Sequence, residues 1–420
     1  MHEFQVGEVV ATLGLSLFTL GYGVGPMLFS PMSEIPTLGR RSIYVFTLLL
    51  FVLFQLPTGF ATNMGMLCVF RFITGFLSSP ALATGGATIS DMYKPASVPY
   101  GICIWGALGL LGPVAGPLLG GFIAPARGWR WTIWTITWLN AAVFLLLFFT
   151  MPETSSANIL HKRAARLREA TGDTRYRSAT ELAADKQTWR DNLRIVSRAC
   201  ALTFTEPIVF ALDLYVALLY GILFIWFESF PFVFGGIYHF TTQQQGLAFI
   251  GIFVGALISV PLFLLWIRRG IAPKIASSPR FPPEQVLPPT FVGSACLPLC
   301  LLWYGWSSRE SVHWIMPIAG SGFFSVAIVT LFNPVLTYLG IAYPEYAASV
   351  FAGNALFRAS FGAVFPLFVS LCMKHLSEYP TDGESFRHAS SSAVWALGRA
   401  TRCWLGWRYY SCRCLICSIM

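Results

Sequence analysis

Four charged side chains lie inside long apolar stretches of the sequence, where a charge needs a chemical reason. They are Arg71, Asp213, Glu228 and Arg358. A charge inside a membrane costs at least ~2.5 kcal/mol on insertion scales, so such residues face a protein interior or a wet cavity. A carboxylate there can take up and release protons, and a nearby arginine changes how readily it does so. We therefore expect these residues to line a cavity or couple proton movement.

Each of these residues also has a simpler interpretation. Arg71 could snorkel to the outer interface, and Asp213 could simply sit at the membrane surface. Asp213 and Glu228 are fifteen positions apart, about 22 Å along a helix, so they cannot share a proton. Glu228, in an aromatic neighbourhood, is the better candidate for a cavity. Arg358 is expected to be compensated by a carboxylate on a neighbouring helix.

A second set of charges lies in connections between apolar stretches: Glu34, Arg40, Arg41 and Asp91. Opposite charges at the same end of neighbouring helices can form an ion-pair latch that yields during a conformational change. The alternative for Arg40 and Arg41 is the ordinary excess of cations in cytoplasmic loops.

One stretch combines five glycines and two prolines in thirteen residues, which a soluble helix would not tolerate. In a membrane, neighbouring helices satisfy the freed backbone groups, and the missing side chains allow close helix packing. We expect this helix to be a deformable contact with the facing half of the molecule, and tight packing alone is the alternative. The residues are Gly109, Gly112, Pro113, Gly116, Pro117, Gly120 and Gly121.

Aromatic residues near the two carboxylates offer flat apolar surface for greasy, planar ligands. We expect Tyr215, Tyr220, Trp226 and Phe227 to line the substrate cavity. The sequence contains no Ser/His/Asp set, no histidines at metal-ligand spacing and no phosphate-binding glycine loop followed by Lys-Ser or Lys-Thr. We therefore predict neither an enzyme nor a metal site.

The elements that must position these residues are membrane spans. The 420 residues are 55% hydrophobic and 11% charged, with a net charge of +9, whereas soluble domains are about 25% charged. No basic domain with interleaved aromatics suggests nucleic-acid binding. Windows of about 20 apolar residues predict ten spans, near 8–31, 42–62, 66–90, 99–124, 131–151, 205–231, 244–267, 287–306, 314–338 and 347–372.

The connections between these spans alternate in charge. Five of them, including a long segment at 152–204, hold seventeen Lys or Arg, and the others hold three. Cation-rich loops stay in the cytoplasm, so the long segment is a cytoplasmic linker, partly helical, with anionic lipid as one possible support. It separates a bundle at 1–151 from a second bundle at 205–372.

After the last span the composition changes abruptly. Residues 373–420 carry five arginines and four cysteines within the last eighteen residues, with no apolar window long enough to span a membrane. We expect an atypical tail that arises from a frameshift or a mis-read exon.

Several ordered motifs resemble the major facilitator superfamily, specifically the fungal drug:proton antiporters with twelve spans. The resemblance covers residues 4–372. Any one motif is weak evidence for the family, whereas the ordered set of motifs is specific to it. The motifs include GPMLFSPMSEIP from Gly25, RFITG from Arg71, the glycine-proline run, MPET from Met151 and FRASFG from Phe357. It implies family spans two to eleven, without the first and last.

The resemblance implies two helical bundles around a midplane cavity and alternating access. It further implies export of hydrophobic drugs, toxins or fungal metabolites, driven by the proton gradient without a cofactor, by a monomer in the cell membrane or vacuolar membrane. It links Arg71 to proton coupling and the loop charges to a latch that holds one conformation. Two alternatives stay open: an uptake transporter for a small nutrient, and an inactive membrane fragment.

Overall fold

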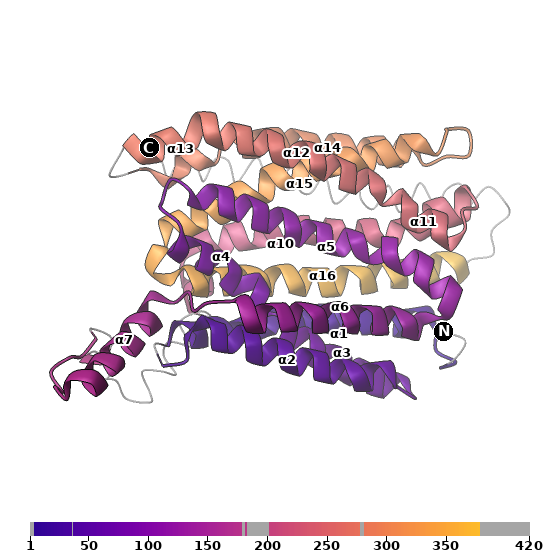
Figure 1. The fold of residues 1–420 in the computed structure, drawn as a ribbon. Coiled ribbons are helices and arrows are strands. Elements are labelled where there is room, and N and C mark those ends of the chain that lie inside the picture. Colours follow the sequence, from indigo (N-terminus) through magenta and orange to yellow (C-terminus); the bar gives the residue numbers. More distant parts are fainter. Residues whose placement is uncertain (1–3, 36, 179–180, 183–200, 278–280, 379–420) are drawn as a thin grey trace.

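The computed structural model describes residues 4–35, 37–178, 181–182, 201–277 and 281–378, and the long helices among them lie side by side (Figure 1). Their axes are nearly parallel. In Figure 1 the first helices lie at the bottom and α12 to α15 at the top, with α10 and α16 between them. The expected all-α membrane architecture is confirmed.

In the amino-terminal part, one expected span is divided into two helices, which the sequence did not predict. The single span expected at 66–90 forms two helices in line, because Pro80 lacks an N–H and favours the first position of a new helix. The helices are α1 (Glu8–Glu34), α2 (Gly39–Gly59), α3 (Met64–Ser78), α4 (Pro80–Met92), α5 (Val98–Arg127) and α6 (Trp129–Thr150).

The carboxy-terminal part contains longer helices interrupted by π and 3-10 turns. The Thr241 and Gln244 side chains form a capping box that starts α11. The elements are α10 (Pro207–Phe230), η1 (Pro231–Ile237), α11 (Thr242–Ala248), α12 (Ile250–Trp266), η2 (Ile267–Ile271), α13 (Ala272–Ser277), η3 (Pro283–Val286), α14 (Pro289–Ser307), α15 (Ile315–Ala342), η4 (Pro344–Tyr346) and α16 (Ala347–Glu378).

Nine of the ten expected spans correspond to helical segments that, in the described residues, are long and apolar enough to cross a membrane. The tenth, expected at 287–306, forms the 19-residue helix α14, which packs along α15. It falls outside the set of nine because Pro298 and several polar or indole side chains lower its mean hydropathy. Its helical form and its place beside α15 still match the expected span.

The cation-rich connections meet at one end of the bundle. Arg40, which follows the first of them, forms an ion pair with Asp91 in the second, and its backbone N–H donates to Glu153 at the start of the linker. The linker helix α7 (Ser156–Thr171) extends outward beyond this end (Figure 1). The loop pattern expected from charge therefore agrees with the helix directions. The tail expected at 379–420 and linker residues 183–200 lie outside the described residues.

Large apolar side chains cover the outside of the bundle as well as its core. Trp138, Leu146 and Phe149 on α6 are 71%, 60% and 78% exposed. Exposed apolar surface of this extent marks a membrane-facing protein. Acyl chains, rather than water, are the fitting neighbours of this face.

Candidate functional site

A buried carboxylate and a buried amide join α10 to α16. Asp213 is fully buried, and its Oδ1 accepts a hydrogen bond of 2.9 Å from Nδ2 of Asn354. Its other oxygen, Oδ2, has no hydrogen-bond partner among the described residues. Asp213 is therefore enclosed between α10 and α16 and does not face the outside of the bundle. Asn354, an amide inside an apolar span, was the sequence signal for this partner.

One helical turn beyond Asn354, a buried guanidinium stacks between two aromatic rings. Cζ of Arg358 lies 5.0 Å from the ring centroid of Tyr220 and 4.9 Å from that of Phe332. Such cation–π contacts stabilise a desolvated cation. Arg358 also interacts electrostatically with Asp213 and with Tyr22 on α1. Asp213 is thus a carboxylate on a neighbouring helix, but no ion pair or hydrogen bond joins these two described side chains, and Nε of Arg358 is buried without a partner among the described residues.

Beside this cluster, α1 and α16 approach so closely that only a glycine fits. A Cβ on Gly23 would collide with Cβ of Ala359 and lie 3.4 Å from the Ala355 carbonyl oxygen. On its other face, α1 contacts α3 and Ser79 through Gly21 and Gly25. This seam joins the amino-terminal and carboxy-terminal helices. The alternating glycines of GYGVG at 21–25 were its sequence signal, which the sequence analysis missed.

The glycine-proline run of α5 makes less of the contact between halves than expected. A Cβ on Gly109, Gly112, Gly116 or Gly120 would meet no described atom within 4 Å. Their three- and four-residue spacing puts these four on one face of α5, away from buried Leu110 and Val114. These four glycines therefore do not make the expected contact with the facing half, and α5 makes that contact through its other face.

Two glycines of α5 do meet the facing half. A Cβ on Gly121 would lie 3.0 Å from the Thr242 carbonyl oxygen and 3.2 Å from Cα of Gly246 on α11. A Cβ on Gly106, just before the run, would collide with Oδ1 of Asn333 on α15. Between them, Leu110 and Val114 pack in one core cluster with carboxy-terminal residues, and the Pro117 carbonyl oxygen lies against Gly246 of α11. Pro113 and Pro117 lie inside a helix that stays continuous.

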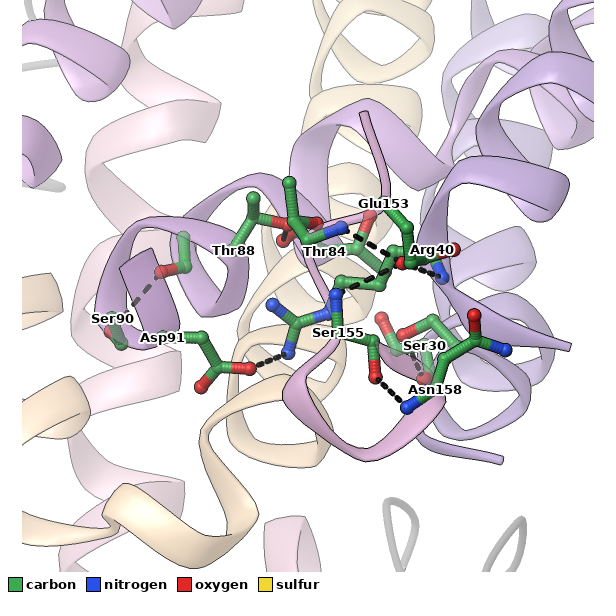
Figure 2. Close-up of polar contacts among 12 residues, drawn as sticks. Ser30, Arg40, Thr84, Thr88, Ser90, Asp91, Glu153, Ser155 and Asn158 are labelled. Atoms are coloured by element: carbon green, nitrogen blue, oxygen red, sulfur yellow. Dashed lines mark hydrogen bonds and ion pairs between the residues drawn. The ribbon is translucent and has the colours of Figure 1, made fainter. Parts of the chain in front are cut away.

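At the other site, Arg40 and Asp91 form the ion pair that the latch hypothesis requires. Nη2 of Arg40 lies 2.8 Å from Oδ2 of Asp91, with the arginine buried and the aspartate exposed (Figure 2). The pair ties the start of α2 to the end of α4. Nε and Nη1 of Arg40 are buried without a hydrogen-bond partner among the described residues.

Glu153 extends this pair to the linker, and sequence reasoning gave it no role. Its Oε1 accepts hydrogen bonds from the backbone N–H groups of Arg40, Thr154 and Ser155, at 3.0, 2.9 and 2.9 Å (Figure 2). Gly39 has φ +71 and no room for a Cβ beside Glu153 and Asn158, so a glycine is required there. The MPET motif was the available signal.

The remaining loop charges differ in environment. Arg41 is exposed, and its Nη2 donates to the Phe148 carbonyl oxygen at 2.9 Å. Glu34 is the half-buried last residue of α1. The pair Arg40–Asp91 therefore carries the latch geometry, while Arg41 ties α2 to the end of α6.

Replacing Arg40 by glutamine is expected to destabilise the protein far more than replacing Arg41 by glutamine. Arg40 is buried and paired, so its loss costs about 1–3 kcal/mol, whereas one exposed hydrogen bond contributes below about 1 kcal/mol. Melting curves of the two purified variants in detergent test this. Equal melting temperatures for both variants would show that the Arg40–Asp91 pair has no stabilising role.

The other two charges of the first hypothesis are less enclosed. Arg71 is half-buried on α3, and no described carboxylate pairs with it. Glu228 is also half-buried, fifteen positions beyond Asp213 on α10. The structure brings Asp213 and Arg358 together and leaves Arg71 and Glu228 outside that cluster, so their roles stay predictions.

The expected cavity aromatics divide into two groups. Trp226 is 3% exposed and stacks on Phe324 with a centroid distance of 4.4 Å. It belongs to the core, so the expectation that it lines a cavity is wrong. Tyr215, Tyr220 and Phe227 are half-buried, and Tyr220 contacts Arg358, which leaves these three as candidates.

Comparison with known proteins places these features in a family. The family model described as Major Facilitator Superfamily matches residues 1–377. Transporter mfs1 of Schizosaccharomyces pombe is 44% identical over 366 residues, which cover 87% of this chain and 69% of that protein. Fluconazole resistance protein 1 of Saccharomyces cerevisiae is 44% identical, with 87% and 66% covered. Efflux pump FUBT of Fusarium oxysporum is 35% identical, with 88% and 62% covered.

The chain spans about two thirds of the length of these relatives. Among solved structures, the human organic anion transporter MFSD10 matches with a TM-score of 0.59 at 18% identity, covering 86% of this chain and 76% of that one. At that identity the match establishes the fold alone. The relatives by sequence are fungal proteins whose names describe a transporter, a fluconazole resistance protein and an efflux pump.

Proposed function

The chain belongs to the Major Facilitator Superfamily as a multi-pass membrane protein related to fungal efflux pumps, and from this premise we propose that it exports hydrophobic small molecules in exchange for protons. One observation carries the proton part of the proposal. Asp213 is fully buried beside the seam of the two halves, with one oxygen unpartnered among the described residues. Burial makes an ionised carboxylate costly unless its neighbours compensate it, and the neighbours here are Asn354 and Arg358.

The proton step is local. Protonation of Asp213 removes a buried negative charge, so Arg358 loses its electrostatic partner while it keeps the rings of Tyr220 and Phe332. The relative energy of two packing arrangements of α10 and α16 would then depend on whether Asp213 is protonated, as a two-state element requires. Because α16 packs on α1 at Gly23, the difference reaches the amino-terminal helices. Proton binding and helix movement are coupled at one seam.

The proposed substrate is apolar or weakly cationic and contains an aromatic group. Tyr215, Tyr220 and Phe227 supply flat surfaces, and they lie on α10 with Asp213. Flat apolar surfaces with few polar groups bind such molecules without strict selectivity. We place the transporter in the cell membrane, with the vacuolar membrane as the alternative, and propose that it acts as a monomer.

Proteoliposomes that contain the purified chain test the proposal. A fluorescent lipophilic dye on the cytoplasmic side should move faster when the opposite side is more acidic, and an ionophore that collapses the gradient should abolish the acceleration. A dye flux that ignores the imposed gradient contradicts proton exchange. Acceleration only when proton and dye move in the same direction would favour uptake, and no flux at all would favour the inactive fragment.

The linker contains an ion pair, Arg168–Glu181, whose carboxylate is not expected to titrate in the physiological range. The Arg168 guanidinium, at 2.7 Å, and the Ser178 N–H hold the pKa of Glu181 down at about 2. A carboxyl whose pKa is depressed by folding stabilises the folded state above its ordinary pKa and loses that effect as pH falls. The protection factors of the linker amides, from which the intrinsic pH dependence of exchange is removed, should therefore stay constant from neutral pH until pH falls below about 4.5, the unperturbed value. Nδ1 of His161 lies 3.0 Å from Oε1 of Glu181, so His161→Gln is the control, and a transition near pH 6 to 7 that persists in this variant would contradict the assignment.

A further inference from the structure

Helix α7 of the linker has two faces of different character. One face packs inward through Asn158 and Ala164, both buried, and through Arg168, which bonds Glu181. The opposite face is exposed. Helical spacing places on it Ile159, Leu160, Arg163, Arg166 and Leu167.

The apolar part of this free face is substantial. Ile159 is 44% exposed, Leu160 53% and Leu167 39%. Three large aliphatic side chains on one face of an otherwise polar helix are unfavourable in water. A covering surface must accept them together with the adjacent arginines.

The charge of the segment selects that surface. Residues 156–178 hold six lysines or arginines and two carboxylates. Arg168 is paired with Glu181 and Arg175 with Asp173, whereas no described carboxylate pairs with Lys162, Arg163 or Arg166. The free face is therefore cationic as well as apolar. Arginine binds phosphate oxygens through two parallel hydrogen bonds.

The helix is held in place at its first turn. Glu153 bonds the backbone N–H of Arg40 at the start of α2, and the Ser155 side chain caps α7 by accepting from the Asn158 N–H (Figure 2). Asn158 packs against Gly39. The helix therefore leaves the bundle at a fixed point, at the end where the cation-rich connections lie (Figure 1).

We propose that the free face of α7 binds the anionic lipid headgroups of the cytoplasmic leaflet. Its leucines and isoleucine enter the boundary between headgroups and acyl chains, and its arginines contact lipid phosphates, as in helices that lie in the membrane interface. A protein partner is disfavoured, because the bilayer surrounds the bundle at the same end and matches both the charge and the apolar residues.

Hydrogen exchange of the full chain in lipid nanodiscs tests the proposal. One disc contains phosphatidylcholine alone, and the other contains phosphatidylcholine with phosphatidylserine. We expect α7 amides to exchange about fivefold or more slowly in the anionic disc, and high salt to remove most of the difference. Identical exchange in the two discs would overturn the proposal. If α7 amides were protected in native membranes but not in the anionic disc, a protein partner would be responsible, and the proposal would again be overturned.

Variants separate the two parts of the face. Arg163→Gln with Arg166→Gln should abolish the lipid-dependent slowing, and so should Leu160→Ser with Leu167→Ser. The matched control is Arg127→Gln with Arg309→Gln, which removes the same charge from connections at the opposite end and should keep the slowing. Persistence of the effect in the first variant, or its loss in the control, would overturn the assignment to α7.

Discussion

Replacement of Asp213 by asparagine is expected to reduce gradient-driven export by about tenfold or more, since an amide cannot exchange a proton. The amide keeps the size of the side chain and can still bond Asn354, so folding should survive. It also mimics the neutral form permanently. Exchange of labelled for unlabelled dye without a gradient should therefore continue. The measurement is dye flux in proteoliposomes with and without an imposed pH difference.

Glu228→Gln is the matched control for this variant. It removes the same charge from the same helix, but from a half-buried position outside the Asp213–Arg358 cluster. Its export should keep the response to the gradient. If Asp213→Asn responds to the gradient as the unmodified chain does, or if Glu228→Gln alone abolishes the response, Asp213 is not the proton carrier.

Replacement of Gly23 by alanine is expected to impair both stability and transport. The added methyl would collide with Cβ of Ala359, and overpacking of a close contact costs about 1–3 kcal/mol. Because both colliding Cβ atoms are attached directly to the backbone, side-chain rotation cannot relieve the collision, and α1 and α16 must move apart. The melting temperature and the dye flux of the purified variant should both fall.

A second substitution in the facing helix should reverse this effect. With Ala359→Gly, the nearest remaining atom to the new methyl is the Ala355 carbonyl oxygen at 3.4 Å, an ordinary contact. The double variant should therefore recover most of the lost stability and flux, which a double-mutant cycle measures. Gly14→Ala, on the same helix with no described atom within 4 Å, should have little effect. Failure of the double variant to recover would show that the collision is not the cause.

The fold was predictable from the sequence because membrane insertion requires long, contiguous apolar stretches, which are easy to recognise. Long apolar stretches and cation-rich loops located the helices and their directions. The departures were the proline break at 79–80, the interruption at Phe249 between α11 and α12, and the less apolar α14. Arg40–Asp91 was also predictable, because opposite charges at neighbouring helix ends have few other partners.

The sequence could not give the partners of the buried charges. Whether Asp213 faces a headgroup layer or Asn354 depends on the rotation of α10 about its axis, which apolar residues on all sides leave undetermined. The same ambiguity affected α5, where a motif of seven small or cyclic residues attracted the prediction while the seam between α1 and α16 lay at Gly23. A single glycine opposite a single alanine leaves little trace in one sequence.

The hydrogen bond from the Arg40 backbone N–H to Glu153 joins the linker helix α7 to the amino-terminal helices and not to the carboxy-terminal ones. Because Glu153, just before α7, is bonded to the start of α2, this helix is expected to move together with the amino-terminal helices. Any pull on α7 is transmitted through Arg40 to Asp91, so events at the cytoplasmic surface can bias which side of the membrane the transporter faces.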